Sequence, residues 1–97
     1  MASKMEYLDF ILEQLDLLDD ITYRSMMGEF LLYYRQVLIG GIYDNRLLVK
    51  IVKENKKYEM KETIPYPGAK PMYLASDVDD KELLKNVVLD TYKCLRK

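Results

Sequence analysis

The fold is decided by the stretch from Phe30 to Val52, which reads FLLYYRQVLIGGIYDNRLLVKIV. Runs rich in Ile, Val, Leu and Tyr alternate there with short polar breaks, a pattern typical of strands joined by hairpin turns. Asp44 and Asn45 form the clearest break, because both residue types tolerate the positive φ that a two-residue hairpin turn requires. Strands joined by such short links are antiparallel, since a parallel pair needs a crossover of a dozen or more residues. This stretch therefore predicts an antiparallel meander.

The same pattern sets the approximate limits of the strands. We expect strands near residues 22–27, 30–35, 37–43 and 46–52, with the other breaks at Gly28 and at Arg35-Gln36. Residues 53–70 are polar, and we expect at most one helical turn in them, near residues 54–60. Residues 71–75 predict a final strand at a sheet edge, where the N–H that Pro71 lacks is not needed.

Two amphipathic helices flank this predicted sheet. Apolar residues recur at intervals of three and four between residues 4 and 18, and again between residues 80 and 95. That spacing is typical of a helix with one buried face. Capping-box patterns accompany both starts, Ser3 with Glu6 and Asp79 with Glu82. Because each helix is apolar on one face only, the economical arrangement places both on the same side of the sheet.

The sequence therefore predicts an α+β fold, a two-layer sandwich of an antiparallel meander sheet with N- and C-terminal helices. We expect residues 1–97 to form a single domain, because two shorter pieces could not each bury a proper core.

The composition excludes several kinds of chemistry. The 97 residues include fifteen Lys and Arg against sixteen Asp and Glu, and the net charge of −1 lacks the basic excess usual in nucleic-acid-binding proteins. The chain has no His and one Cys, so it offers no His general base, no Cys–His pair and no cysteine cluster for zinc. We expect a non-enzymatic protein with no cofactor, no metal and no small-molecule substrate. The single thiol, Cys94, is expected to be a small buried side chain at the margin of the last helix's apolar face.

The sequence also bears on location. Acidic residues interrupt the N-terminal apolar stretch, unlike the continuous apolar region of a signal peptide. No uncharged run approaches the roughly 20 residues that a membrane-spanning helix needs. We therefore expect a cytoplasmic protein that does not enter a membrane.

A motif crosses the predicted sheet, and its residues are Arg24, Met26, Gly28, Leu32, Tyr33, Leu47, Val49 and Lys50. In this motif the chain resembles the TfoX N-terminal domain family, also called Sxy. Met27, Glu29 and Leu48 stand where that family usually has Phe, Gly and Tyr. The resemblance implies a sandwich similar to the secretion-chaperone-like fold. It also implies a regulatory module, since the best-known members regulate competence genes together with the cyclic-AMP receptor protein.

The charge is unevenly distributed, and residues 46–61 carry six bases against two acids. Lys53, Lys56 and Lys57, with Tyr58 beside them, are candidate contacts for a nucleic-acid backbone and a stacked base. A solvated surface loop is the alternative interpretation. We do not expect the chain alone to bind a specific duplex DNA sequence, because its lysines do not follow a helix suited to the major groove.

Surplus apolar side chains suggest a protein partner or a homodimer. Phe10, Leu17 and Leu89 lie off the buried faces of the two helices, and helices on one side of the sheet leave its other face uncovered. Either a partner covers that second face or the long loop of residues 53–70 folds back over it.

Two further groups have structural interpretations. Gly40 and Gly41 indicate a bulge or a close backbone approach, because no phosphate-binding helix follows them. The acidic cluster after the last strand is interpreted as helix capping rather than a metal site. Its members are Asp77, Asp79, Asp80 and Glu82.

Overall fold

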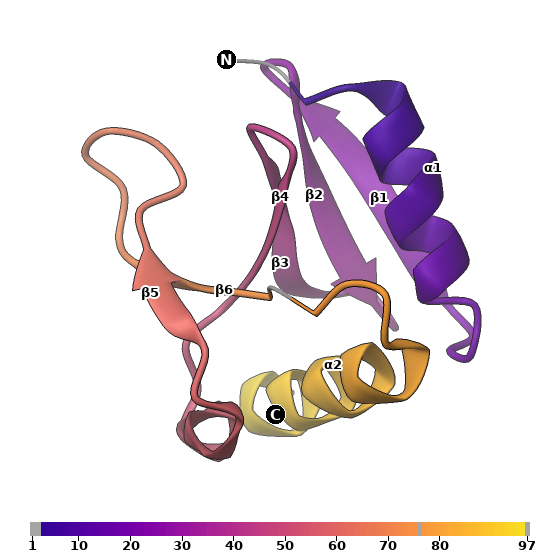
Figure 1. Cartoon of the computed structure of the whole chain (residues 1–97), viewed down its shortest axis with the longest axis vertical. Coiled ribbons are helices and arrows are strands. Elements are labelled where there is room, and N and C mark those ends of the chain that lie inside the picture. The colour runs from indigo at the N-terminus through magenta and orange to yellow at the C-terminus, as the bar shows by residue number, and fades with distance from the viewer. Residues whose placement is uncertain (1–2, 76, 97) are drawn as a thin grey trace.

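The computed structural model describes residues 3–75 and 77–96. The elements, in chain order, are α1 (Met5–Gln14), β1 (Ile21–Met26), β2 (Glu29–Tyr34), β3 (Val37–Tyr43), β4 (Arg46–Val49), the 3-10 helix η1 (Lys53–Tyr58), β5 (Lys61–Thr63), β6 (Met72–Leu74) and α2 (Lys81–Leu95). The strands form one antiparallel sheet in the order β1-β2-β3-β4-β6-β5 (Figure 1). The α+β class predicted from the sequence is confirmed.

Two-residue turns build the meander of β1 to β4. They are Met27-Gly28, Arg35-Gln36 and Asp44-Asn45, and all of these residues have positive φ. Positive φ at both central positions is the type I′ geometry, whose twist matches that of the strands it joins. The hairpin at Asp44-Asn45 is thus confirmed. β1 and β2 end one residue earlier than expected, because Met27 and Arg35 belong to the turns.

Gly40 and Gly41 let β3 approach both neighbouring strands closely. The register between β2 and β3 shifts after Leu32, as at a β-bulge. A Cβ on Gly40 would lie 2.2 Å from the carbonyl oxygen of Leu48, and one on Gly41 would lie 2.5 Å from that of Phe30. Real side chains do not fit at such distances, so the close approach predicted for these glycines is confirmed.

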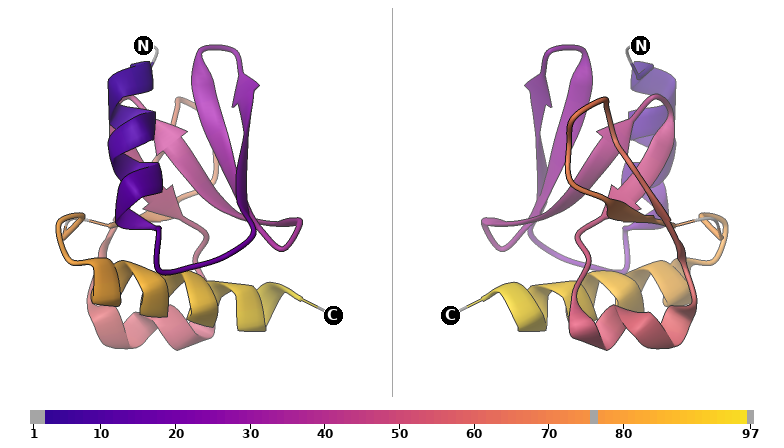
Figure 2. Two further views of the ribbon diagram at one scale, coloured as in Figure 1. Left: turned by 90° about the vertical axis from the view of Figure 1, so that its right-hand side faces the viewer. Right: turned by 90° about the vertical axis from the view of Figure 1, so that its left-hand side faces the viewer.

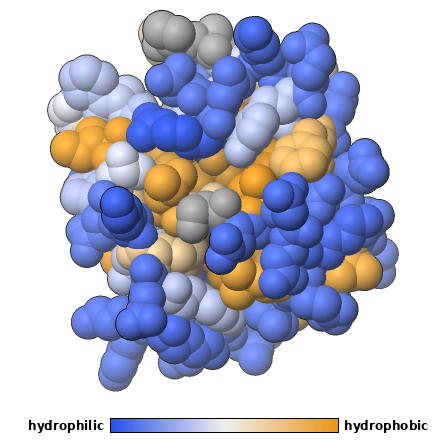
Figure 3. Space-filling view, viewed as in Figure 1, coloured by the Kyte–Doolittle hydropathy of each residue, from blue (hydrophilic) through white to orange (hydrophobic). Residues whose placement is uncertain are grey.

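Both helices pack on one face of the sheet. A single buried cluster joins Leu8 and Ile11 of α1, Leu84 and Val88 of α2, and alternate residues of β2. Figure 2 shows the two helices running in different directions, with α2 at the lower end of the strands and η1 lying along α2. In Figure 3 the apolar side chains gather in the middle of the view, and hydrophilic side chains surround them. The two-layer arrangement follows from this shared core.

The first helix is shorter than the expected range of 4–18. α1 ends at Gln14, and Leu15 and Leu18 continue the core from the turns that follow, where they are 2% and 9% exposed. Leu15 and Leu18 lie in turns but continue the three- and four-residue spacing of the apolar residues, so this spacing alone could not locate the end of the helix. The capping box at Ser3 is wrong, since the N-cap is Lys4 and no side chain caps the helix.

The end of the sheet also differs from the expectation. The strand predicted at residues 71–75 is β6, but it lies between β4 and β5 rather than at an edge. The edge strand is β5, whose residues are all polar, so the sequence shows no alternation of apolar residues that would predict it. β4 ends at Val49 instead of residue 52. The Lys50 N–H still donates to the carbonyl of Ile39 on β3, and the chain enters η1 at Lys53. The expected helical turn is η1 itself.

The second helix begins with a cap from the acidic cluster. The Asp80 carboxylate accepts a hydrogen bond from the Leu83 N–H at 3.1 Å, so Asp80 is the N-cap in place of Asp79. The buried face of α2 consists of Leu84, Val87, Val88 and Thr91. Cys94 is exposed, and the expectation that it is buried is wrong because its position lies off this face.

Candidate functional site

A groove lies on the second face of the sheet, the face away from α1 and α2. It has a volume of about 600 Å³, and the loop of residues 64–71 forms one of its walls. Leu38, Tyr43, Ile51 and Met72 supply its apolar floor and sides. We call this feature the second-face groove.

Two observations show that the loop packs against the second face. Pro65 is buried, and the rings of Tyr66 and Tyr43 lie 6.1 Å apart between centroids in a tilted arrangement. Tyr66 nevertheless remains 51% exposed. The long loop therefore folds back over part of this face, which was one of the two alternatives drawn from the sequence, and leaves a groove beside it.

The charge of the second-face groove is positive. Lys50 and Lys70 line it, and no acidic side chain of the described residues does so. Burial raises the pKa of the Tyr43 hydroxyl above its ordinary value, and the neighbouring Tyr66 and Glu29 raise it further. Tyr43 is therefore a neutral hydroxyl at neutral pH. The groove combines two cations with an apolar and aromatic lining, which suits a ligand that carries both carboxylates and apolar groups.

A second hollow of about 400 Å³ lies between α2, β6 and the end of η1. Its wall includes Leu74, Leu83 and Val87, and its rim carries Glu59 and Asp77 as well as Lys61. The mixed charge of this rim gives no preference for an anion or a cation.

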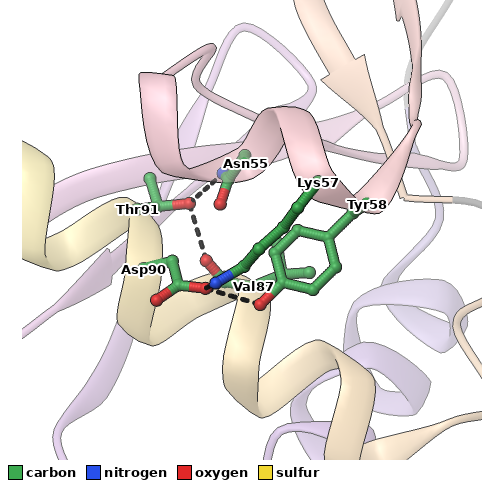
Figure 4. Close-up of polar contacts among 6 residues, drawn as sticks. All are labelled: Asn55, Lys57, Tyr58, Val87, Asp90 and Thr91. Carbon is green, nitrogen blue, oxygen red and sulfur yellow. Dashed lines mark hydrogen bonds and ion pairs between the residues drawn. The ribbon is translucent and has the colours of Figure 1, made fainter.

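The candidate nucleic-acid contacts lie on η1. Polar contacts bind η1 to α2 (Figure 4), and we call the residues that make them the η1 clasp: Asn55, Lys57 and Tyr58 of η1 with Val87, Asp90 and Thr91 of α2. The Lys57 ammonium is 3.0 Å from the Asp90 carboxylate, and the Tyr58 hydroxyl donates to the same carboxylate at 2.5 Å. Lys53 and Lys56 are exposed. Lys57 is paired with Asp90 although its side chain is 56% exposed, whereas Lys53 and Lys56 have no ion-pair partner among the described residues.

The ionisation of the η1 clasp follows from these contacts. Burial and the hydrogen bond to Asp90 raise the pKa of Tyr58 to about 12. Burial on its own raises the pKa of Asp90, but the hydrogen bonds from Tyr58 and Lys57 outweigh it, and the pKa is lowered. Asp90 is therefore a carboxylate and Tyr58 a neutral phenol at neutral pH, the forms that hold the clasp together.

A buried amide completes the η1 clasp. Asn55 and Thr91 are both 0% exposed. The Asn55 Nδ2 donates to Thr91 Oγ1 at 2.6 Å, and Thr91 Oγ1 donates to the Val87 carbonyl at 2.7 Å. The Asn55 Oδ1 has no hydrogen-bond partner among the described residues. No sequence pattern indicated this pair, since the two residues are 36 positions apart.

Glu29 has a structural role at the other end of the molecule. Its carboxylate accepts hydrogen bonds from the backbone N–H of Ser3 at 2.9 Å, from the Ser3 hydroxyl at 2.6 Å and from the Asp44 N–H at 3.2 Å. These bonds hold Ser3, just before α1, against the β3–β4 turn. Among the described residues, no group of three or more acidic or thiol side chains is placed to hold a metal ion.

The motif residues fall into two groups. Leu32, Leu47 and Val49 are buried, and Gly28 occupies a turn with φ of 86°, so these positions support the fold. The other motif residues are less buried: Arg24 is exposed on β1, Met26 and Tyr33 are half-buried, and Lys50 is half-buried in the second-face groove. Among the motif residues, Lys50 is the one that lines the groove.

The candidate interface residues do not form one patch. Phe10 and Leu89 are partly buried against the main core, whereas Leu17 is 45% exposed in the turn after α1. None of the helices within the described residues has the length and apolarity that crossing a bilayer requires.

Comparison with known proteins gives one informative similarity. No family model matches the chain. The chain is 32% identical over 80 residues to an "Uncharacterized 12.7 kDa protein in trpE 5'region" of Spirochaeta aurantia, and the match covers 80% of this chain and 70% of that protein. Identity at this level over most of both chains indicates common descent, and this chain belongs to the family of that uncharacterized spirochaete protein.

Proposed function

We propose that this chain is a non-enzymatic regulatory or protein-interaction module, and that it binds an acidic, apolar peptide segment of a partner protein in the second-face groove. The observation that carries the proposal is the lining of this groove, in which the described residues place two lysines over an apolar and aromatic floor and no acidic side chain. Carboxylates of the peptide would pair with Lys50 and Lys70, and its apolar side chains would cover the floor between them.

A peptide fits this lining better than a nucleic acid does. Leu38, Ile51 and Met72 are aliphatic, and aliphatic floors favour aliphatic side chains over bases. A nucleic-acid strand requires a longer line of cations and aromatic platforms on which successive bases stack. The η1 lysines Lys53 and Lys56 are not among the residues that line the groove.

The proposed role agrees with the resemblance to the TfoX N-terminal domain. Those domains are regulatory, and Lys50 is a residue of the matching motif. A cytoplasmic regulator of competence or transcription that acts through a protein partner is the biological form of this proposal.

The test is a binding titration by fluorescence anisotropy. The probe is a fluorescein-labelled decapeptide of alternating Glu and Leu, compared with the same peptide carrying Lys for Glu and with a labelled dT10 oligonucleotide. We expect the Glu-Leu peptide to bind and the Lys-Leu peptide not to bind. The double variant Lys50→Glu/Lys70→Glu should weaken binding at least tenfold, because it reverses both charges of the groove.

The matched control is Lys53→Glu/Lys56→Glu, which makes the same charge change on η1. It should leave binding of the Glu-Leu peptide within a factor of two. If instead the control variant weakens binding as strongly as the groove variant does, the attraction is a general effect of net charge and the proposal is wrong. Preferential binding of dT10 that is lost in the control variant would favour the nucleic-acid alternative.

A further inference from the structure

β1 is an edge strand without the usual protection. The two edges of the sheet are β1 and β5. β5 has three residues, two of them charged, whereas β1 has six residues and the single charge of Arg24. Proteins ordinarily blunt an edge with charges, proline, a bulge or a covering segment. β1 contains no proline, and its register with β2 runs without a shift from Ile21 to Met26.

The free side of β1 is also open in space. Residues 22–25 are exposed, and the Tyr23 side chain is 43% exposed although its ring packs edge-on against Phe30. The left view of Figure 2 shows β1 on the outer side of its hairpin, with α1 on the opposite side. Within the described residues no segment lies along this edge.

The hairpin geometry identifies which backbone groups are free. The turn has two residues, so the closing pair Met26 and Glu29 exchanges its backbone hydrogen bonds, and hydrogen-bonded pairs recur at every second residue. The Arg35 N–H donates to the Asp20 carbonyl at 3.1 Å, which confirms that even-numbered residues bond to β2. Ile21, Tyr23 and Ser25 therefore direct their N–H and C=O groups outward, away from the sheet.

We propose that β1 pairs in an antiparallel manner with β1 of a second copy of this chain, with Tyr23 on the twofold axis. Three outward residues centred on Tyr23 are self-complementary under a twofold rotation. Tyr23 then faces Tyr23 of the second copy, and Ile21 faces Ser25. All three residues form backbone hydrogen bonds, and the two sheets become one continuous sheet. This surface is separate from the second-face groove, and the proposal does not depend on peptide binding.

Charge selects this register over its neighbours. In the Tyr23-centred register Arg24 faces Thr22 of the second copy. A shift by two residues in one direction places Arg24 directly opposite Arg24, and like charges directly opposite each other destabilise a strand pair. A shift in the other direction centres the pair on Thr22 and leaves Ser25 opposite Asp19, which lies outside β1. The Tyr23-centred register is the one that pairs every outward residue of the strand without opposing like charges.

The first test is sedimentation velocity between about 1 and 100 µM. We expect the full chain to form a dimer within this range. Tyr23→Lys, and separately Ser25→Lys, should weaken the dimer at least tenfold, since each places a lysine on the paired edge. The matched control, Glu62→Lys on the β5 edge, should leave the dimer unchanged. A chain that is monomeric at 100 µM overturns the proposal, and so does a dimer that neither β1 variant weakens while far-UV circular dichroism shows folded protein.

The second test determines the register by disulfide crosslinking. Thr22→Cys, Tyr23→Cys and Arg24→Cys are each made in a Cys94→Ser background, because Cys94 is exposed. In the proposed register the Cα atoms at position 23 lie about 5.5 Å apart, a distance that a disulfide spans. Those at positions 22 and 24 lie about 8 Å from their symmetry mates, which is beyond that range. We expect Tyr23→Cys to crosslink at least tenfold faster than the other two variants, and faster crosslinking of either other variant overturns the proposed register.

Discussion

The buried hydrogen bond between Asn55 and Thr91 gives a prediction about stability. Thr91→Val keeps the shape of the side chain and removes its hydroxyl. The Asn55 Nδ2 then loses the acceptor that lies 2.6 Å away, at a position where both side chains are 0% exposed. A buried donor left without a partner costs about 1–3 kcal/mol. We therefore expect Thr91→Val to lower the free energy of unfolding by about 1–3 kcal/mol.

A double-mutant cycle isolates this hydrogen bond from packing. In an Asn55→Ala background no amide remains to lose its partner, so Thr91→Val should cost less than about 0.5 kcal/mol there. Urea unfolding followed by far-UV circular dichroism gives each free energy, and an unchanged m-value shows that the unfolded states are comparable. In thermal unfolding, 1 kcal/mol corresponds to a shift of about 4–8 °C for a domain of this size. Equal costs of Thr91→Val in the two backgrounds would refute the proposed coupling.

Further predictions concern ionisation and packing. The pKa of Tyr58 is raised to about 12, so its contribution to stability is present below pH 10 and lost as the pH rises towards 12. The gap in unfolding free energy between wild type and Tyr58→Phe should shrink across that interval. The pKa of Asp90 is lowered, so its contribution is present above about pH 4 and lost as the pH falls through the lower folded value. Urea titrations should show a flatter acid limb for Asp90→Asn than for wild type. Gly40→Ala should prevent folding, because its Cβ would lie 2.2 Å from a carbonyl oxygen, whereas Gly68→Ala, with φ of 87° and open space, should cost about 1 kcal/mol in thermal unfolding. Leu15→Ala should cost about 2–5 kcal/mol in urea, since Leu15 is 2% exposed, and a cost below 1 kcal/mol would contradict its place in the core.

Features of the fold that are set by residues close together in the sequence were predictable. Asp44-Asn45 specifies its turn by its own backbone preferences. Which face of β2 is buried was not predictable, because residues 30–34 are all aliphatic or aromatic and show no apolar–polar alternation. The limits of α1 were not predictable, because Leu15 and Leu18 continue the apolar spacing in turns. β5 was missed because a short polar strand lacks any apolar alternation, and its pairing with β6 depends on residues some ten positions later in the chain.

The candidate site was predictable only in fragments. The excess of basic residues in 46–61 was evident from the sequence. The sequence did not show that these residues serve different sites, with Lys50 lining the second-face groove and Lys57 paired with Asp90. The groove itself requires the loop of residues 64–71 to return over the sheet, and the sequence left this open against a partner chain. The second lysine of the groove, Lys70, was not singled out, since no local pattern connects it to Lys50.

The most direct test of the proposed function is an NMR titration of the ¹⁵N-labelled full chain with the Glu-Leu decapeptide. We expect the largest amide shift changes along the lining of the second-face groove, at Leu38, Tyr43, Lys50, Tyr66 and Met72. The amides of η1 should change little, and the Lys50→Glu/Lys70→Glu variant should show no changes at the same peptide concentration. Shift changes confined to η1, or equal changes with the Lys-Leu peptide, would contradict the assignment of the groove as the binding site.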